Sequence, residues 1–126
     1  DTKYRSSSLK GIDEIKLYSR IRAMLEIEEL YLVPSLLLKT LADKLETNTK
    51  YLSQVVNHCS GHNFQQFINT YRIEHVKYRL NEGAQEYLTL FGVAQQCGFK
   101  NKSTFYKVFK DITGLTPKEY LENLNT

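Results

Sequence analysis

Apolar residues recur at three- and four-residue steps along most of the chain, which is the spacing of one face of an α-helix. Two of these stripes match each other at a constant offset, and each ends at a glycine, Gly61 or Gly114. The matched positions are Leu52, Val55, Val56 and Cys59 in the first stripe and Phe105, Val108, Phe109 and Ile112 in the second. The opposite faces carry Lys, Ser, Thr, Gln, Asn and Tyr and no acid. The pattern predicts two similar short helices, each apolar behind and polar or basic in front.

A longer amphipathic helix is expected near the start of the chain, from Ile12 to about Leu30. Its inward positions would be Ile15, Tyr18, Ile21 and Leu25. Residues 1–11 are polar and are expected to form a loose lead-in. We therefore divide the sequence into an N-terminal segment, residues 1–33, and a repeated domain, residues 34–126.

A short helix precedes each matched helix and places a small residue, Ala42 or Ala94, where two helices would cross. Such a pair is a helix-turn-helix, whose second helix enters the major groove of DNA. The expected elements are a first helix-turn-helix at about 36–60, a linker helix at about 64–82, a second helix-turn-helix at about 89–113 and a C-terminal helix at about 117–124. The predicted class is all-α, with two homeodomain-like three-helix lobes. A linker of roughly 28 Å would let one monomer read two major grooves about 34 Å apart.

Capping residues support these helix starts. Asn48 and Asn101 precede the two matched helices, and Thr89 precedes the second short helix. Asn63 with Gln66, and Thr116 with Pro117 and Glu119, have the spacing of capping boxes.

Composition and charge are consistent with one compact domain that binds a polyanion. The 126 residues are 41% hydrophobic and 25% charged, and the formal net charge is +3. Residues 47–110 hold eight Lys/Arg and three Asp/Glu, so the positive excess lies across the repeated region. The two cysteines lie in apolar helical patterns and are expected to be reduced in a cytoplasmic protein, and no membrane span is expected.

From about Leu30 to Tyr120 the chain resembles the DNA-binding domain of AraC/XylS-type transcription regulators. The residues that carry the resemblance are Tyr31-Leu32, Leu41-Ala42, Tyr51-Leu52-Ser53, Phe64, Phe67-Ile68, Tyr71-Arg72-Ile73, Val93-Ala94, Gly98-Phe99, Ser103-Thr104-Phe105, Val108-Phe109-Lys110, Gly114-Leu115-Thr116-Pro117 and Tyr120. The run from Tyr51 to Asn57 and the pair Asn63-Phe64 resemble the sequences of the family's subgroup in Bacteroidetes-type bacteria. The resemblance implies sequence-specific binding of double-stranded DNA, contact with RNA polymerase, and often a homodimer formed through the N-terminal segment or through regions outside this sequence. It also implies a structural role for Arg72 in the linker helix.

The resemblance assigns roles to residues on both matched helices. Base contacts are expected from Lys50, Ser53 and Gln54 in the first unit and from Lys102, Ser103, Tyr106 and Lys107 in the second. Phosphate contacts are expected from Thr49, Tyr51, Asn57, Asn101, Thr104 and Lys110. Both helices lack the arginine that is common in the family, so bidentate reading of guanine is expected to be weaker.

Other classes of function have less support. A helical protein-interaction module would present aromatic or Met anchors where these faces carry Lys, Ser, Gln and Asn. An output domain of a larger membrane or two-component sensor is compatible with DNA binding. His58, His62, Cys59 and Cys97 lack the paired spacings of zinc sites, and the sequence has no catalytic motif, so neither a cofactor nor an enzyme is expected.

Overall fold

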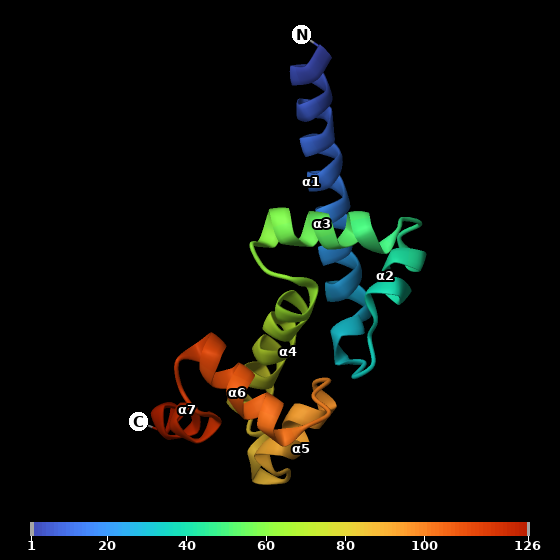
Figure 1. The fold of residues 1–126 in the computed structure, drawn as a ribbon. Coiled ribbons are helices and arrows are strands. Elements are labelled where there is room, and N and C mark those ends of the chain that lie inside the picture. The colour runs from blue at the N-terminus through green and yellow to red at the C-terminus, as the bar shows by residue number, and fades with distance from the viewer. Residues whose placement is uncertain (1, 126) are drawn as a thin grey trace. The chain divides into compact units, whose positions relative to one another are not determined.

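The computed structural model describes residues 2–125, and it describes side chains from residue 11 to residue 125. Over this part of the chain all regular structure is helical, which confirms the predicted all-α class. The elements are α1 (Thr2–Glu28), η1 (Leu30–Leu32), α2 (Leu38–Lys44), α3 (Thr49–Ser60), α4 (Phe64–Asn81), η2 (Ala84–Glu86), α5 (Leu90–Gln96), α6 (Lys102–Thr113) and α7 (Pro117–Leu124), where η marks a 3-10 turn (Figure 1).

The chain forms two compact units. Unit 1 consists of Asp1–Leu30 and Leu36–Phe67, and unit 2 consists of Tyr31–Ser35 and Ile68–Thr126. Helix α4 therefore contributes its first turn to unit 1 and its remainder to unit 2. The predicted domain boundary at residue 33 stays a prediction. The compact units do not follow this boundary, because each unit combines segments from both sides of it.

Unit 1 is built from α1, α2 and α3. Helix α3 lies across α1 (Figure 1) and also packs against α2. The core of unit 1 is formed by buried apolar side chains: Leu17, Ile21, Leu25, Leu41, Ala42, Leu45, Leu52, Val55, Val56 and Phe67. The small Ala42 is 1% exposed, as a steep crossing of two helices requires.

Two expectations for α1 were wrong. The helix begins at Thr2, so residues 2–11 continue the helix and do not form a loose lead-in. Ile15 is 63% exposed, whereas Leu17 is buried. The buried face steps by four residues from Leu17 through Ile21 to Leu25, and Ile15 lies off that row.

Unit 2 has its own apolar core around α5 and α6. The buried side chains are Ile73, Val76, Leu80, Ala84, Val93, Ala94, Cys97, Phe99, Phe105 and Phe109. The ring of Phe105 lies 5.3 Å from Phe99 and 5.8 Å from Phe109, measured between centroids. Phe109 in turn meets Tyr120 of α7 edge-to-face at 5.5 Å, an arrangement that aromatic quadrupoles favour.

The predicted caps are confirmed. The side chains of Asn48 and Asn101 accept from the backbone N–H of Tyr51 and Thr104 at 2.8 and 2.9 Å. The reciprocal bonds of a capping box are present between Thr116 and Glu119. Asn63 and Gln66 also exchange reciprocal bonds, at 2.8 and 3.0 Å, and Thr89 accepts from the N–H of Gly92 at 2.9 Å.

Arg72 has the structural role that the resemblance implies. Its side chain is 5% exposed and donates from Nε to the Tyr31 carbonyl oxygen at 2.7 Å and from an Nη atom to the Val33 carbonyl oxygen at 2.9 Å. Burial lowers the pKa of its guanidinium. Within unit 2, Arg72 therefore ties residues 31–33 to α4.

Candidate nucleic-acid interface

Helix α3 presents a polar face on an apolar base. Leu52, Val55 and Val56 are fully buried on one side, while Lys50 and Asn57 are exposed on the other. Asn48 caps the N-terminus of α3, and Gly61 ends it with a left-handed φ of 78°. The burial pattern and both ends of the helix follow from the local sequence, so the first of the two predicted helices is present.

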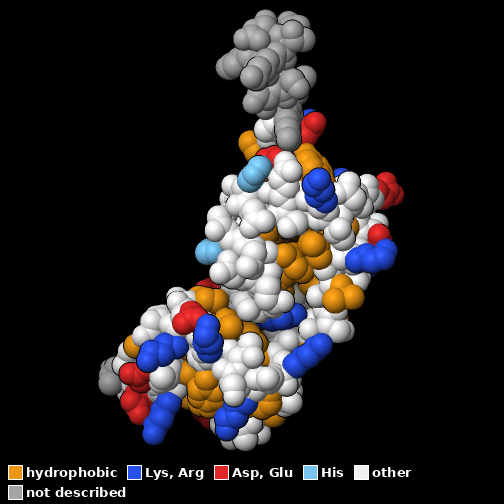
Figure 2. All heavy atoms as spheres, in the orientation of Figure 1, with side chains coloured by type: hydrophobic (Ala, Val, Ile, Leu, Met, Phe, Trp, Pro, Cys, Tyr) orange, Lys and Arg blue, Asp and Glu red, His pale blue; other side chains and the backbone are white. Residues whose placement is uncertain are grey.

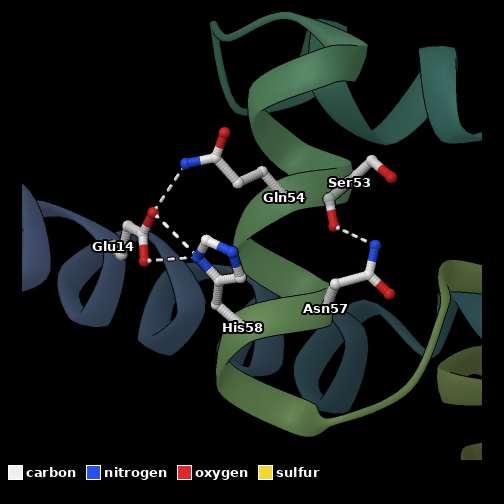
Figure 3. Close-up of polar contacts among 5 residues, drawn as sticks. All are labelled: Glu14, Ser53, Gln54, Asn57 and His58. Atoms are coloured by element: carbon white, nitrogen blue, oxygen red, sulfur yellow. Dashed lines mark hydrogen bonds and ion pairs between the residues drawn. The ribbon is translucent and has the colours of Figure 1, made fainter.

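The six candidate residues of α3 divide by exposure. Thr49, Lys50 and Asn57 are exposed, whereas Tyr51, Ser53 and Gln54 are partly buried. Asn57 donates its side-chain amide to the Ser53 carbonyl oxygen at 3.0 Å, one turn back along the helix. Figure 3 shows Ser53 and Asn57 on one side of α3, and Gln54 and His58 on the other.

An acid from α1 lies beside this helix, and the sequence did not predict it. Gln54 donates from Nε2 to a carboxylate oxygen of Glu14 at 2.8 Å, and His58 Nδ1 lies 3.2 and 3.3 Å from the two oxygens of the same carboxylate (Figure 3). The pKa of the Tyr51 hydroxyl is raised, mainly by partial burial and to a smaller extent by the negative charges of Glu14 and Asp13. Gln54 and Glu14 are 40 residues apart, so no local pattern could reveal the contact.

Helix α6 is the counterpart of α3 in unit 2. Phe105 and Phe109 are fully buried, and Gly114 ends the helix with a left-handed φ of 80°. The predicted contact residues are mostly exposed: Asn101, Lys102, Ser103, Thr104, Lys107 and Lys110. Tyr106 is partly buried, and the ammonium of Lys102 lies 5.8 Å from the centroid of its ring. The second of the two predicted helices is therefore present as well.

The two faces differ in charge. Helix α6 carries three exposed lysines, and the acid among them, Asp111, pairs with Lys107 at 3.3 Å. Both partners are more than half exposed, so this pair contributes little and opens readily. Helix α3 carries one lysine and His58. In Figure 2, Lys and Arg side chains gather over the region of α6 and α7, and few charged side chains cover α3 in that view.

The cysteines and other potential ligands form no metal site in the described part of the chain. Both cysteines are free thiols, and Cys97 is buried whereas Cys59 is partly exposed. Burial raises the pKa of the Cys97 thiol to about 11. Among the described side chains, no three His, Cys, Asp or Glu residues come together as metal ligands would. None of the described helices combines the length and the apolar character that a membrane crossing needs.

The match to a known family decides the classification. A family described as "Helix-turn-helix domain" matches residues 41–123, which include the second helix pair, all of α3 and the last turn of α2. The chain belongs to the AraC-type helix-turn-helix family. The domain is thus of the helix-turn-helix kind found in DNA-binding transcription regulators.

Individual relatives agree with this assignment. The AraC-type domain is 32% identical over 101 residues to an uncharacterized HTH-type transcriptional regulator of Staphylococcus aureus (strain MSSA476). It is 34% identical over 89 residues to the uncharacterized transcriptional regulatory protein YesN of Bacillus subtilis (strain 168). A solved structure, the C-terminal domain of the two-component response regulator yesN from Fusobacterium nucleatum, is similar with a TM-score of 0.66 and 28% identity, over 84% of this chain and 98% of that one.

The AraC-type domain corresponds to a small part of its longer relatives. The matched segments cover 80% and 69% of this chain, but they are 13% of the Staphylococcus protein and 24% of the Bacillus protein. That the chain belongs to the subgroup of Bacteroidetes-type bacteria stays a prediction.

Proposed function

We propose that the domain reads double-stranded DNA with two recognition helices, α3 of unit 1 and α6 of unit 2. The observation that carries this proposal is that both helices share one design. Each is capped by an Asn, buries an apolar stripe, exposes at least one lysine together with uncharged polar side chains, and ends at a left-handed glycine. A helix with such a face fits the major groove of B-DNA, which is wide enough to admit it.

Base reading is assigned to polar side chains of each helix at the positions that the family resemblance indicates. In α3 these are Lys50, Ser53 and Gln54. Lysine donates to guanine O6 and N7, and the amide of glutamine pairs with adenine N6 and N7. In α6 the equivalent side chains are Lys102, Ser103, Tyr106 and Lys107.

Phosphate contacts are assigned to other polar residues at or near the two helices, again at the positions that the family resemblance indicates. In unit 1 they are Thr49, Tyr51 and Asn57, and in unit 2 they are Asn101, Thr104 and Lys110. Such contacts fix the register of a protein on the duplex and carry no sequence information. The capping oxygen of Asn101 is already bonded to the Thr104 N–H, so its amide N–H₂ is the group left for a phosphate.

Simultaneous reading of two adjacent grooves is part of the proposal. Helix α4 is continuous for 18 residues and belongs to both units. Its length of about 27 Å compares with about 34 Å between successive major grooves on one face of B-DNA. One chain would then cover two neighbouring groove segments of one duplex.

For the whole protein we propose that this domain is the DNA-binding output of a longer bacterial regulator. The similar Fusobacterium structure is named as the C-terminal domain of a two-component response regulator, and the chain spans a small share of its curated relatives. RNA polymerase and a second copy of the protein are its expected partners. The role is binding rather than catalysis, and the proposed location is the cytoplasm, where bacterial DNA lies.

Titration of a labelled duplex at several salt concentrations tests the proposal. Phosphate contacts release counterions, so the logarithm of the affinity should fall linearly and steeply with the logarithm of the salt concentration. An affinity that does not change between low and physiological salt would contradict DNA binding through the polar faces of α3 and α6.

A further inference from the structure

The side chain of Glu14 is held against the recognition helix of unit 1. It projects from α1 and is only 12% exposed. Its carboxylate accepts from Gln54 Nε2 at 2.8 Å and meets His58 Nδ1 at 3.2 Å (Figure 3). Two side chains of α3, one turn apart, thus share one acceptor.

The carboxylate fixes which way the Gln54 amide points. An ionised carboxylate only accepts hydrogen bonds, so the N–H₂ end of the amide must face Glu14 and the oxygen must face elsewhere. An unrestrained glutamine can present either end to DNA. Figure 3 shows the Gln54 oxygen directed away from Glu14.

This orientation leaves the amide able to read a base. Glutamine recognises adenine when its oxygen accepts from N6 and one N–H donates to N7. The bond to Glu14 uses one of the two amide hydrogens and leaves the oxygen and the second hydrogen. Because one orientation is set in advance, less side-chain entropy is lost when DNA binds.

Glu14 also leaves the reading face open. Lys50 and Asn57 remain exposed, and Ser53 and Asn57 lie on the opposite side of α3 from Glu14 (Figure 3). The acid thus borders the polar face and does not cover it.

We propose that Glu14 is a positioning residue that sets the base preference of Gln54, so that α1 is part of the DNA-reading apparatus. The inference rests on the proposed reading of a base by Gln54. Glu14 itself need not touch DNA, and the effect of its removal should be confined to one base pair.

The inference is tested by measuring the affinities of the wild-type domain and its variants for a set of duplexes. In this set, each position of the binding site carries each of the four base pairs in turn. Gln54→Ala identifies the position that Gln54 reads. Glu14→Gln, which can donate as well as accept, should weaken the adenine preference there by roughly three- to tenfold and leave preferences elsewhere unchanged. In the Gln54→Ala background, Glu14→Gln should have no further effect on preference.

Asp13→Asn is the matched control. Asp13 is the neighbouring exposed acid on α1, and its substitution removes the same charge without removing the acceptor of Gln54. It should leave the base preference unchanged. The side-chain amide resonance of Gln54 in DNA-free protein should shift in Glu14→Gln and stay in place in Asp13→Asn, and urea denaturation should show that both variants are folded.

Two results would overturn the inference while leaving the proposed function intact. One is a Glu14→Gln variant that keeps the full adenine preference that Gln54→Ala loses. The other is a Glu14→Gln variant that binds every duplex more tightly by the same factor, because Glu14 would then only repel DNA or block its access to α3. Failure of the wild-type domain to bind duplex DNA would instead overturn the proposed function itself, and this inference with it.

Discussion

The guanidinium of Arg72 donates from Nε to the backbone carbonyl oxygen of Tyr31 at 2.7 Å, across 41 residues of sequence. The bond lies in unit 2 and is buried, and a second one reaches Val33 at 2.9 Å. Charge-assisted bonds in a buried setting are among the stronger ones in proteins. Arg72 thus helps to hold the segment before α2 in unit 2.

Arg72→Met should lower the free energy of unfolding by about 2–3 kcal/mol, because it removes bonds to a charged donor and leaves two carbonyl groups without them. Urea denaturation followed by circular dichroism measures the change. Arg20→Met, at an exposed position of α1, is the control and should change stability by less than about 0.5 kcal/mol. Equal costs for the two variants would show that the buried bonds add nothing.

Gly98→Ala should destabilise the domain more than Gly114→Ala. Both glycines have positive φ, 104° and 80°, so each alanine is strained by about 1–2 kcal/mol. A Cβ at Gly98 would also lie 2.5 Å from the Tyr31 carbonyl oxygen and 2.6 Å from Arg72 Nε, whereas nothing lies within 4 Å of a Cβ at Gly114. Thermal unfolding should show a clearly larger loss for Gly98→Ala, and indistinguishable melting temperatures would refute the close approach.

Glu119→Gln should reduce the dependence of stability on pH in the acid range. In the folded protein, hydrogen bonds with the backbone and side chain of Thr116 lower the pKa of Glu119 from its ordinary value of 4.5. The stability that this carboxylate adds is therefore complete above that value and is lost as the pH falls through the lowered pKa. Urea denaturation from pH 6 to pH 3 measures the effect, with Glu122→Gln on the same helix as the control. Identical pH profiles for wild type and Glu119→Gln would contradict the role of the capping box.

Lys110→Ala should weaken binding to all duplexes by a similar factor and reduce the salt slope by about one. The proposed reason is the loss of one phosphate contact, since each such contact releases condensed counterions. Lys118→Ala removes an exposed lysine from α7, outside the proposed face, and should leave the slope nearly unchanged. A change of base preference in Lys110→Ala would instead mean that this lysine reads sequence.

The sequence was sufficient to predict α2 to α7, because the signals for these helices are local. Asn48 and Asn101 cap the helices that the periodicity predicted, and Gly61 and Gly114 end them. The periodicity predicts Ile15 inward because Ile15 fits three-residue steps as well as Leu17 fits four-residue steps. Only the packing of α3 on α1 distinguishes the two rows. The positions of the lysines on the polar faces could also be predicted, because they follow from the local helical periodicity.

Contacts between distant segments could not be read from local patterns. The bond between Glu14 and Gln54 depends on where α1 passes α3, and the bond between Arg72 and Tyr31 was expected only from the family resemblance. By contrast, Lys107 and Asp111 pair at the i,i+4 spacing of a helix, which the sequence alone could have revealed.

The central claim is that both α3 and α6 read bases. Selection of bound sequences from random duplex DNA, carried out with wild type, Lys50→Ala and Lys107→Ala, tests it most directly. We predict that each variant loses about 1–3 kcal/mol of discrimination at its own base positions, and that the two sets lie roughly one helical turn apart. Losses that fall in the same set of positions, or in one variant only, would contradict reading by two recognition helices.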